Sequence, residues 1–164
     1  GIAPPGVPGE QVHHTLVDNL AFAANALHAH GLRLLIEPIN TFDIPGFYVN
    51  RTAQALAILD VVGASNAFVQ YDIYHAQRMQ DDLLGTLQHC LPRIGHIQLA
   101  DSPGRHEPGT GDIPFRVVLD WLDHAGYAGF VGCEYTPHSA GLNPTQAGLG
   151  WLAAHGQVLP GRAA

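Results

Sequence analysis

Lysine is absent from this sequence, and charged side chains of every kind are scarce. All seven basic residues are arginines, and with fourteen acidic residues they give a net charge of −7. Proteins that bind phosphate backbones usually do so through a broad cationic face, so we expect no nucleic-acid partner. Charged residues make up 13% of the chain, about half of the usual ~25%. A surface so poor in charge is typical of one that is partly covered by another molecule or another part of the protein.

Long apolar runs and paired cysteines are also missing. No apolar run approaches the ~18 residues that a membrane span needs, and the first residues lack the charged and apolar regions of a signal peptide. We therefore expect a soluble, cytoplasmic protein with no membrane partner. Cys90 and Cys133 form no CxxC motif. The first lies near a predicted helix end and the second inside an apolar strand, so buried free thiols are favoured over a disulfide.

The length and the apolar content predict one core. The chain has 164 residues, of which 46% are apolar, which is enough for one compact domain and excludes a disordered protein. We predict a single domain over residues 1–164. It comprises a loop over 1–9, βα units over 10–156 and a flexible tail over 157–164.

Helical periodicity alternates with short apolar runs along the chain. The spacing of apolar residues predicts helices over 10–30, 52–62, 81–91, 114–125 and 145–155, and strands over 32–36, 67–71, 94–99 and 130–133. Strands that are apolar at nearly every position, each preceded by an amphipathic helix, are typical of a parallel sheet covered by helices. The fold class is therefore α/β.

A polar side chain stands at or next to the carboxyl end of each predicted strand: Glu37, Asp72, Gln98 and Glu134. In a doubly wound sheet the functional groups gather on two or three loops, whereas in a barrel every strand end faces one central site. Four consecutive strand ends favour a parallel (β/α) barrel of the TIM type. A full barrel has eight strands in about 250 residues, so four βα units predict a partial barrel that lacks its amino-terminal part.

These four side chains bind through oxygen, which hard divalent ions prefer. We therefore predict a Mg²⁺ or Mn²⁺ site whose ligands are Glu37, Asp72, Gln98 and Glu134. Zinc is disfavoured, because neither His nor Cys ends these strands. Taken singly, strand-end acids are as often helix caps or solvated loop residues, and this alternative stays open.

Two further residues are candidates for contacting a substrate. His75 lies three residues after Asp72, on the predicted loop above the strand end, where it can hydrogen-bond a hydroxyl or carbonyl; a structural role is equally expected. Arg105 is the cation of the polar loop after the third strand, and its guanidinium suits a carboxylate. The alternative for Arg105 is a salt bridge to Glu107 or Asp101. His96 shares a strand face with Gln98 and is interpreted as a core residue.

Several stretches together resemble the hydroxypyruvate isomerase group of the xylose isomerase-like barrels. They are Leu35-Ile36-Glu37-Pro38-Ile39-Asn40, Asp43-Ile44-Pro45-Gly46, Gln70-Tyr71-Asp72-Ile73-Tyr74-His75, His96-Ile97-Gln98, Pro103-Gly104-Arg105-His106-Glu107-Pro108-Gly109-Thr110-Gly111 and Gly132-Cys133-Glu134-Tyr135.

The resemblance implies a TIM barrel whose metal ligands match Glu37, Asp72, Gln98 and Glu134. It also implies that Glu37 and Glu134 are the catalytic acid/base pair and that His75 and Arg105 touch the substrate. The first three or so βα units of the family have no counterpart here. The expected reaction interconverts hydroxypyruvate and tartronate semialdehyde (2-hydroxy-3-oxopropanoate) through a cis-enediol.

Three alternatives remain at this point. A related isomerase would act on a four-carbon 2-oxo acid such as 2-oxo-tetronate, or on a sugar. A metal-dependent endonuclease of the same superfamily would need several zinc ligands, mostly His, and a cationic groove, which the net charge disfavours. The third alternative is a non-catalytic fragment or interaction module. Because a four-stranded parallel sheet leaves two open edges, a homo-oligomer is also expected.

Overall fold

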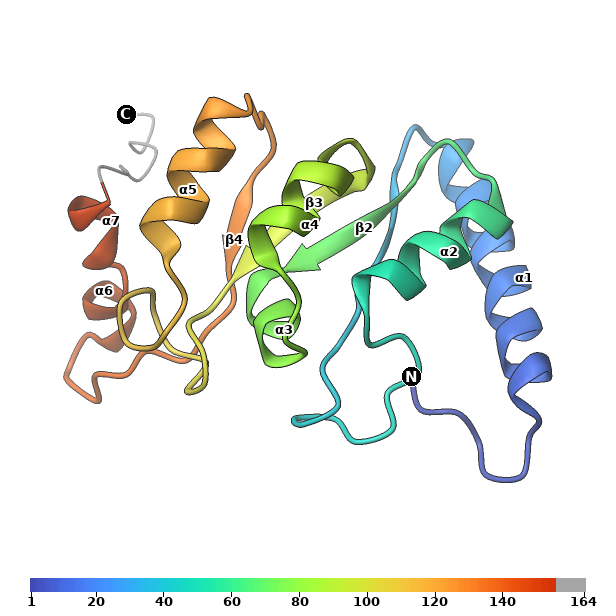
Figure 1. Cartoon of the computed structure of the whole chain (residues 1–164), viewed down its shortest axis with the longest axis horizontal. Helices are drawn as coiled ribbons and strands as arrows, with labels where there is room; N and C mark the ends of the chain where they lie inside the picture. Colours follow the sequence, from blue (N-terminus) through green and yellow to red (C-terminus); the bar gives the residue numbers. More distant parts are fainter. Residues whose placement is uncertain (156–164) are drawn as a thin grey trace.

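Helices and strands alternate along residues 1–155, which are the residues that the computed structural model describes (Figure 1). The predicted tail over 157–164, together with residue 156, lies outside the described residues. The elements are α1 (Gly9–His28), β1 (Leu34–Ile36), α2 (Thr52–Val62), β2 (Ala67–Asp72), α3 (Ile73–Arg78), α4 (Leu83–Cys90), the 3₁₀ helix η1 (Leu91–Arg93), β3 (Ile94–Leu99), α5 (Phe115–His124), β4 (Val131–Cys133), α6 (Pro144–Gly148) and α7 (Trp151–Ala154).

The four strands form one parallel sheet in the order β1-β2-β3-β4. Consecutive strands are therefore neighbours, and each crossover between them contains a helix. The predicted α/β class is confirmed. Within residues 1–155, β1 and β4 each pair with one strand only, so both edges of the sheet are open.

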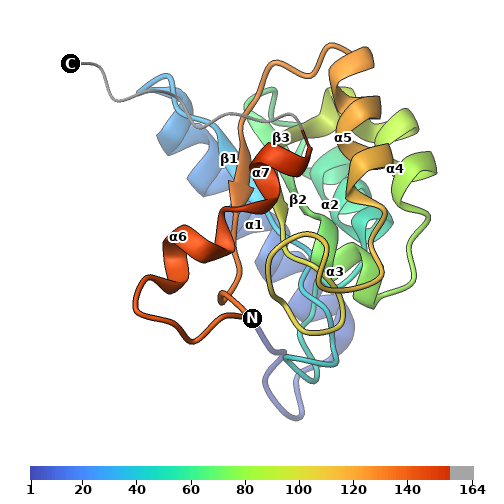
Figure 2. The same cartoon turned by 90° about the vertical axis from the view of Figure 1, so that its left-hand side faces the viewer.

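The two faces of the sheet differ in burial. Val69, Tyr71, Ile97 and Leu99 are at most 1% exposed and pack against the helices in one apolar core. The residues that alternate with them point to the other face and are only half-buried: Phe68, Gln70, His96 and Gln98. Figure 2 shows α2, α4 and α5 gathered on one side of the strands. We refer to this second face as the inner face of the sheet.

Local sequence explains where several helices begin and end. Gly63 closes α2 in the left-handed conformation, with φ of 66°, which glycine adopts without a steric penalty. The side chain of Asp82 caps α4 by accepting a hydrogen bond from the Gly85 amide. The helix predicted over 145–155 is instead two short helices, α6 and α7, because Gly148 and Gly150 flank a break and glycine is unfavourable inside a helix.

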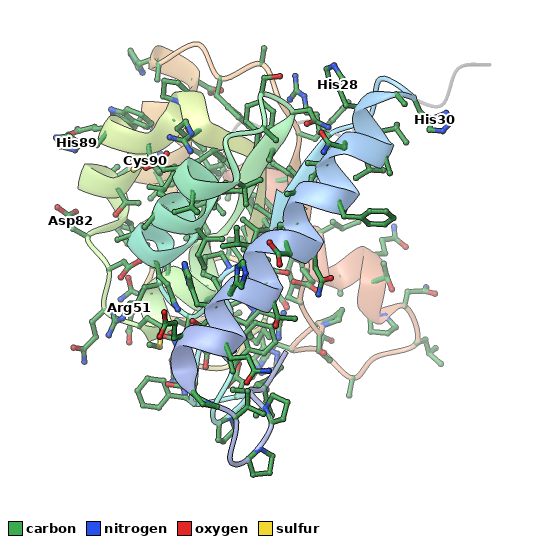
Figure 3. The ribbon with its side chains drawn as sticks, turned by 90° about the vertical axis from the view of Figure 1, so that its right-hand side faces the viewer. His28, His30, Arg51, Asp82, His89 and Cys90 are labelled. Carbon is green, nitrogen blue, oxygen red and sulfur yellow. The ribbon has the colours of Figure 1, made fainter. Side chains whose placement is uncertain are left out.

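Burial corrects the prediction for both cysteines. Cys133 is exposed and Cys90 is half-buried, and both are free thiols. Cys133 ends the edge strand β4, which among the described residues pairs only with β3, so the other side of this strand is open. Cys90 ends α4 on the helical side of the molecule, next to the exposed His89 (Figure 3). No helix among the described residues is long and apolar enough to cross a bilayer.

Candidate active site

The four predicted ligands lie at the carboxyl-terminal edge of the sheet. Asp72 is the last residue of β2 and pairs in register with Gln98 of β3. Glu37 directly follows β1 and Glu134 directly follows β4, and the Glu134 amide donates to the Leu99 carbonyl at 3.0 Å. Parallel strands thus deliver all four side chains to one edge, where the inner face is open to solvent.

The two carboxylate oxygens of Asp72 have different roles: one caps a helix and the other faces the candidate site. Oδ1 accepts hydrogen bonds from the Tyr74 amide at 2.8 Å and the His75 amide at 3.3 Å, which caps α3. Oδ2 is buried and has no hydrogen-bond partner. Burial, with added repulsion from Glu37 and Glu134, raises the pKa of Asp72 to about 7. An unsatisfied buried oxygen of this kind is what a cation would neutralise.

His75 lies on α3, which corrects the prediction that it sits on a loop. The reason is the Asp72 cap, which starts a helix directly at the end of β2. His75 Nε2 is 3.9 Å from Glu37 Oε1 and 3.8 Å from Asp72 Oδ2. Burial, together with the charge of Arg105, lowers the pKa of His75 to about 4. The imidazole is therefore neutral at about pH 7.

Arg105 pairs with Glu134 rather than with the Glu107 or Asp101 considered from the sequence. Its Nη2 donates to Glu134 Oε2 at 2.9 Å, and its guanidinium lies 5.1 Å from the centre of the Tyr74 ring. Burial raises the pKa of Glu37, and the charge of Glu134 raises it further. Glu134 thus lies close enough to Glu37 to raise the pKa of that carboxyl.

Gln70 is a site residue that the sequence analysis missed. Its side-chain amide donates to Gln98 Oε1, and a hydrogen bond with Glu37 lowers the pKa of that carboxyl in part. Gln70 links two of the predicted ligands across the inner face. The available signal was its position two residues before Asp72, because residues two apart share a face of a strand.

Asp101 organises the loop that carries Arg105. It is 1% exposed, and its carboxylate accepts four backbone hydrogen bonds within 101–113. The donors are the amides of Ser102, Gly109, Gly111 and Ile113. The Arg105 amide in turn donates to the Asp101 carbonyl at 2.8 Å. His96, predicted to be a core residue, is half-buried on the inner face, because no element among the described residues packs over it.

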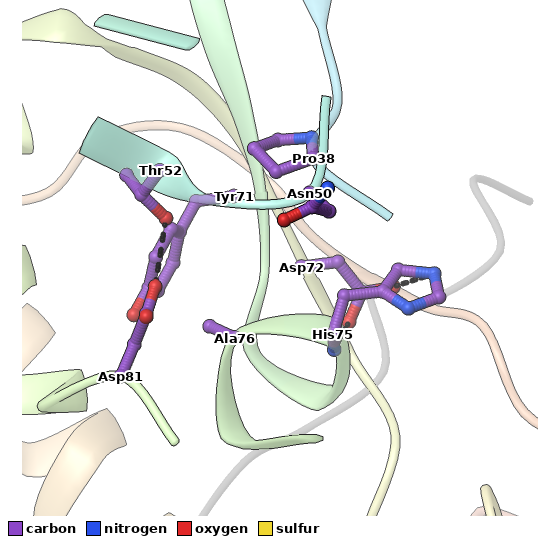
Figure 4. Close-up of a pocket in the computed structure, with 8 residues that line it drawn as sticks. All are labelled: Pro38, Asn50, Thr52, Tyr71, Asp72, His75, Ala76 and Asp81. Atoms are coloured by element: carbon purple, nitrogen blue, oxygen red, sulfur yellow. Dashed lines mark hydrogen bonds and ion pairs between the residues drawn. The ribbon is translucent and has the colours of Figure 1, made fainter. Parts of the chain in front are cut away.

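A small cavity of about 10 Å³ lies beside Asp72 and His75, lined also by Pro38, Asn50, Thr52, Tyr71, Ala76 and Asp81 (Figure 4). A cavity of this size holds at most one water molecule. Tyr71 points to the helical side of the sheet, so the cavity extends behind the carboxylates. A substrate would therefore approach Asp72 and Glu37 from the open inner face.

The arrangement suits a hard cation. One ligand atom from each of Glu37, Asp72 and His75 falls within 4.8 Å of the others. Two of these donors are carboxylates, and the Gln98 amide and the Glu134 carboxylate come from the neighbouring strand ends. Oxygen donors with a buried, unpartnered Asp72 Oδ2 fit a divalent ion that prefers oxygen.

Comparison with known proteins agrees with the predicted family. A family model described as "Xylose isomerase-like TIM barrel" matches residues 1–155. The chain is 49% identical over 152 residues to hydroxypyruvate isomerase of Escherichia coli K12, covering 93% of this chain and 57% of that protein. It is 44% identical to 2-oxo-tetronate isomerase of Cupriavidus necator, with the same two coverages.

A solved structure has the same fold over most of the chain. The crystal structure of AP endonuclease, family 2, from Brucella melitensis is similar with a TM-score of 0.85 and 35% identity, over 92% of this chain and 57% of that one. The chain thus spans a little more than half the length of the relatives that it matches. The predicted partial barrel is confirmed by this match.

Proposed function

The chain belongs to the xylose isomerase-like TIM barrel family, and from this premise we propose that it supplies the active site of an isomerase interconverting hydroxypyruvate and tartronate semialdehyde. The proposal treats residues 1–164 as one unit, the carboxyl-terminal half of the barrel. The observation that carries it is the meeting of Glu37, Asp72 and neutral His75 within 4.8 Å, at the edge where Glu134 and Arg105 pair. The relative from Escherichia coli supports the choice of substrate.

The chemistry requires a proton to move between adjacent carbons. One of the two glutamates, Glu37 or Glu134, removes a proton from the carbon that bears the hydroxyl while the carbonyl oxygen takes up a proton, which gives the cis-enediol. The other returns a proton to the neighbouring carbon while the original hydroxyl gives up its proton and becomes the new carbonyl, so that no atom or electron is gained or lost. A carboxyl whose pKa is raised toward neutrality, as at Glu37, is suited to exchanging protons.

The remaining residues bind and orient the substrate and the metal ion. Arg105 uses one N–H of Nη2 in its pair with Glu134, so other N–H groups of its fork are left for the substrate carboxylate. His75 donates from its ring to an oxygen of the substrate, on which charge develops. Glu37, Asp72, Gln98 and Glu134 would hold Mg²⁺ or Mn²⁺, which when bound polarises the substrate oxygens.

The test is an NMR assay of hydroxypyruvate in deuterated water with Mg²⁺. We expect tartronate semialdehyde to form with solvent deuterium at the carbon that receives the proton. Glu134→Gln and Glu37→Gln should each lower the rate by about 10²–10⁴-fold. Glu10→Gln is the matched control, because Glu10 is exposed in the first turn of α1. Near-normal turnover in Glu134→Gln would contradict the assigned role.

Thermal melting separates an enzyme from an interaction module. A chain that holds a cation at this edge should melt at a higher temperature with Mn²⁺, because a ligand that binds only the folded state stabilises it. Glu37→Gln should abolish that increase, and Glu10→Gln should preserve it. No response to Mn²⁺ and no conversion of hydroxypyruvate would favour a non-catalytic fragment.

A second candidate substrate is 2-oxo-tetronate, because the relative from Cupriavidus necator is nearly as similar as that from Escherichia coli. Comparing kcat/KM for the two acids decides between them. An endonuclease activity is less well supported. The chain carries a net charge of −7 and no lysine, whereas DNA binding needs cations along the phosphate backbone.

A further inference from the structure

Asn40 is a fully buried side chain that contacts His75 from behind. It is 0% exposed and lies three residues after Glu37. Its Oδ1 accepts hydrogen bonds from the backbone amides of Phe42 at 3.0 Å and Asp43 at 2.8 Å. A backbone amide can only donate, so these two contacts fix which end of the Asn40 side chain is oxygen.

The Asn40 amide group therefore donates on its other side. Nδ2 is 2.9 Å from Asp43 Oδ2 and 2.7 Å from His75 Nδ1. The backbone amide of Asn40 points to the same ring nitrogen at 3.4 Å. A nitrogen that faces donors must accept, so His75 Nδ1 carries no proton in the neutral ring. The ring proton is then on Nε2, the nitrogen that faces the carboxylates.

We infer that Asn40 is a positioning residue that holds His75 in its Nε2–H tautomer, so that His75 serves as a hydrogen-bond donor to the substrate and not as a metal ligand. Ligation through Nε2 would require a lone pair there and a proton on Nδ1, pointing at the Asn40 amide hydrogens. The use of the donor rests on the proposed function, whereas the tautomer is a property of the chain itself.

The space in front of Nε2 is consistent with this role. The ring nitrogen is 3.9 Å from Glu37 and 3.8 Å from Asp72, and both distances are longer than a hydrogen bond. Neither carboxylate therefore takes up the Nε2 proton, which can be donated to a third partner. Of the three side chains within 4.8 Å, only the two carboxylates are left to ligate a cation.

Asp43 braces Asn40 from the far side. Its Oδ2 accepts from Asn40 Nδ2 and, at 2.8 Å, from the Tyr74 hydroxyl. The polar chain runs from Tyr74 and Asn40 to Asp43, and from Asn40 to His75. Because Asn40 Oδ1 is anchored by backbone amides, the charge on Asp43 is not needed to keep the Asn40 amide turned toward the ring.

The test is ¹H–¹⁵N NMR of the His75 ring at about pH 8, where a histidine with the usual pKa is also neutral, with and without Mg²⁺. We expect the wild-type ring to be protonated at Nε2 in both conditions. The double variant Asn40→Asp with Asp43→Asn keeps the net charge and reverses the donor at position 40. It should move the ring proton to Nδ1. The single variant Asp43→Asn should retain the Nε2–H tautomer.

A wild-type ring protonated at Nδ1, or a double variant that retains Nε2–H, would overturn the inference. The backbone amide spectrum checks that each variant is folded. If the double variant does not fold, Asn40→Leu removes the donor without adding charge and should give a mixture of tautomers; an unchanged ring would again overturn it. An Nε2–H ring in a chain that converts no hydroxypyruvate would refute the proposed function and leave the role of Asn40 intact.

Discussion

Among single residues, Asp72 serves two purposes that oppose each other: it caps a helix, and it presents a buried charge to the proposed metal ion. Its Oδ1 caps α3, while its buried Oδ2 has no partner. An ionised carboxylate left unsatisfied in the interior costs free energy in the folded state. The pKa raised to about 7 is the same cost seen through proton binding. Substitution of Asp72 by a neutral residue should therefore raise the stability of the metal-free chain and weaken metal binding.

Asp72→Asn should stabilise the metal-free chain by about 1–3 kcal/mol at about pH 8. Asparagine keeps an acceptor for the α3 cap and removes the buried charge. In the wild type the folded state binds the Asp72 proton more tightly than the unfolded state, so stability falls as pH rises from 3.8 to about 7. The gain in the variant should grow over that window and then level off, as urea unfolding at several pH values would show.

The same variant should lose the stabilisation by Mn²⁺ that the wild type shows. Asp123→Asn is the control, because Asp123 is exposed on α5; its stability and its response to Mn²⁺ should match the wild type. A less stable Asp72→Asn chain, or one that still responds fully to Mn²⁺, would contradict this account.

Among the elements, the loop over 101–113 has a fixed shape that depends on one carboxylate. Asp101 accepts the amides of Gly109 and Gly111 on Oδ2 and those of Ser102 and Ile113 on Oδ1. At Gly111 the loop passes so close to the Ser102 carbonyl that an added Cβ would lie 2.0 Å from its oxygen. The loop holds Arg105 against Glu134, so its shape matters for the site.

Asp101→Asn should destabilise the chain by about 3 kcal/mol, because one acceptor oxygen becomes a donor that faces backbone amides. Urea unfolding measures the loss, and limited proteolysis should show earlier cleavage within 101–113. Asp112→Asn is the matched control in the same loop, because Asp112 is exposed; its stability should change by less than about 0.5 kcal/mol. Equal losses in the two variants would refute the role given to Asp101.

The sequence predicts elements well where the pattern is long and poorly where a side chain starts an element. The strands over 67–71 and 94–99 agree with β2 and β3 to within a residue, because each is a short, mostly apolar run that follows a helix and a turn. Helix α3 escaped prediction because six residues show no period, and only the Asp72 cap starts it. Gln70 was overlooked because a polar residue on the inner face interrupts an apolar run without marking a strand end.

Other aspects of the site cannot be read from spacing at all. The pairing of Arg105 with Glu134 depends on the register of β3 and β4, so sequence reasoning could offer only the nearer Glu107 and Asp101. The orientation of His75 depends on Asn40, which lies thirty-five positions away. Such contacts follow from tertiary packing.

At the scale of the whole molecule, the open sheet edges are the feature that most affects behaviour in solution. Within residues 1–155, β1 and β4 each have one neighbour, and Phe130, just before β4, is 87% exposed. Unpaired edges and exposed apolar side chains promote association with other chains. We expect the chain to self-associate in solution as its concentration rises, which agrees with the homo-oligomer considered from the sequence.

Phe130→Lys should reduce that association, because a lysine beside an edge strand opposes strand pairing. Light scattering after size-exclusion chromatography measures the mass. Phe22→Lys is the matched control: Phe22 is 76% exposed but lies on the helix α1, whose backbone groups are already hydrogen-bonded within the helix, so its effect should be smaller. Equal effects of the two variants would indicate non-specific adhesion through exposed aromatic rings.

Every group assigned to chemistry here lies at the end of, or just after, one of four consecutive strands of a single sheet. In the proposed function, the half of the barrel that determines the reaction is therefore distinct from the half that closes the barrel. A chimera that joins this segment to the complementary half of a distant barrel should carry over the choice of reaction from this segment, while the grafted half sets solubility and the outer walls of the pocket. Recombination between barrel genes at such a midpoint would exchange scaffolds without dismantling the reaction centre.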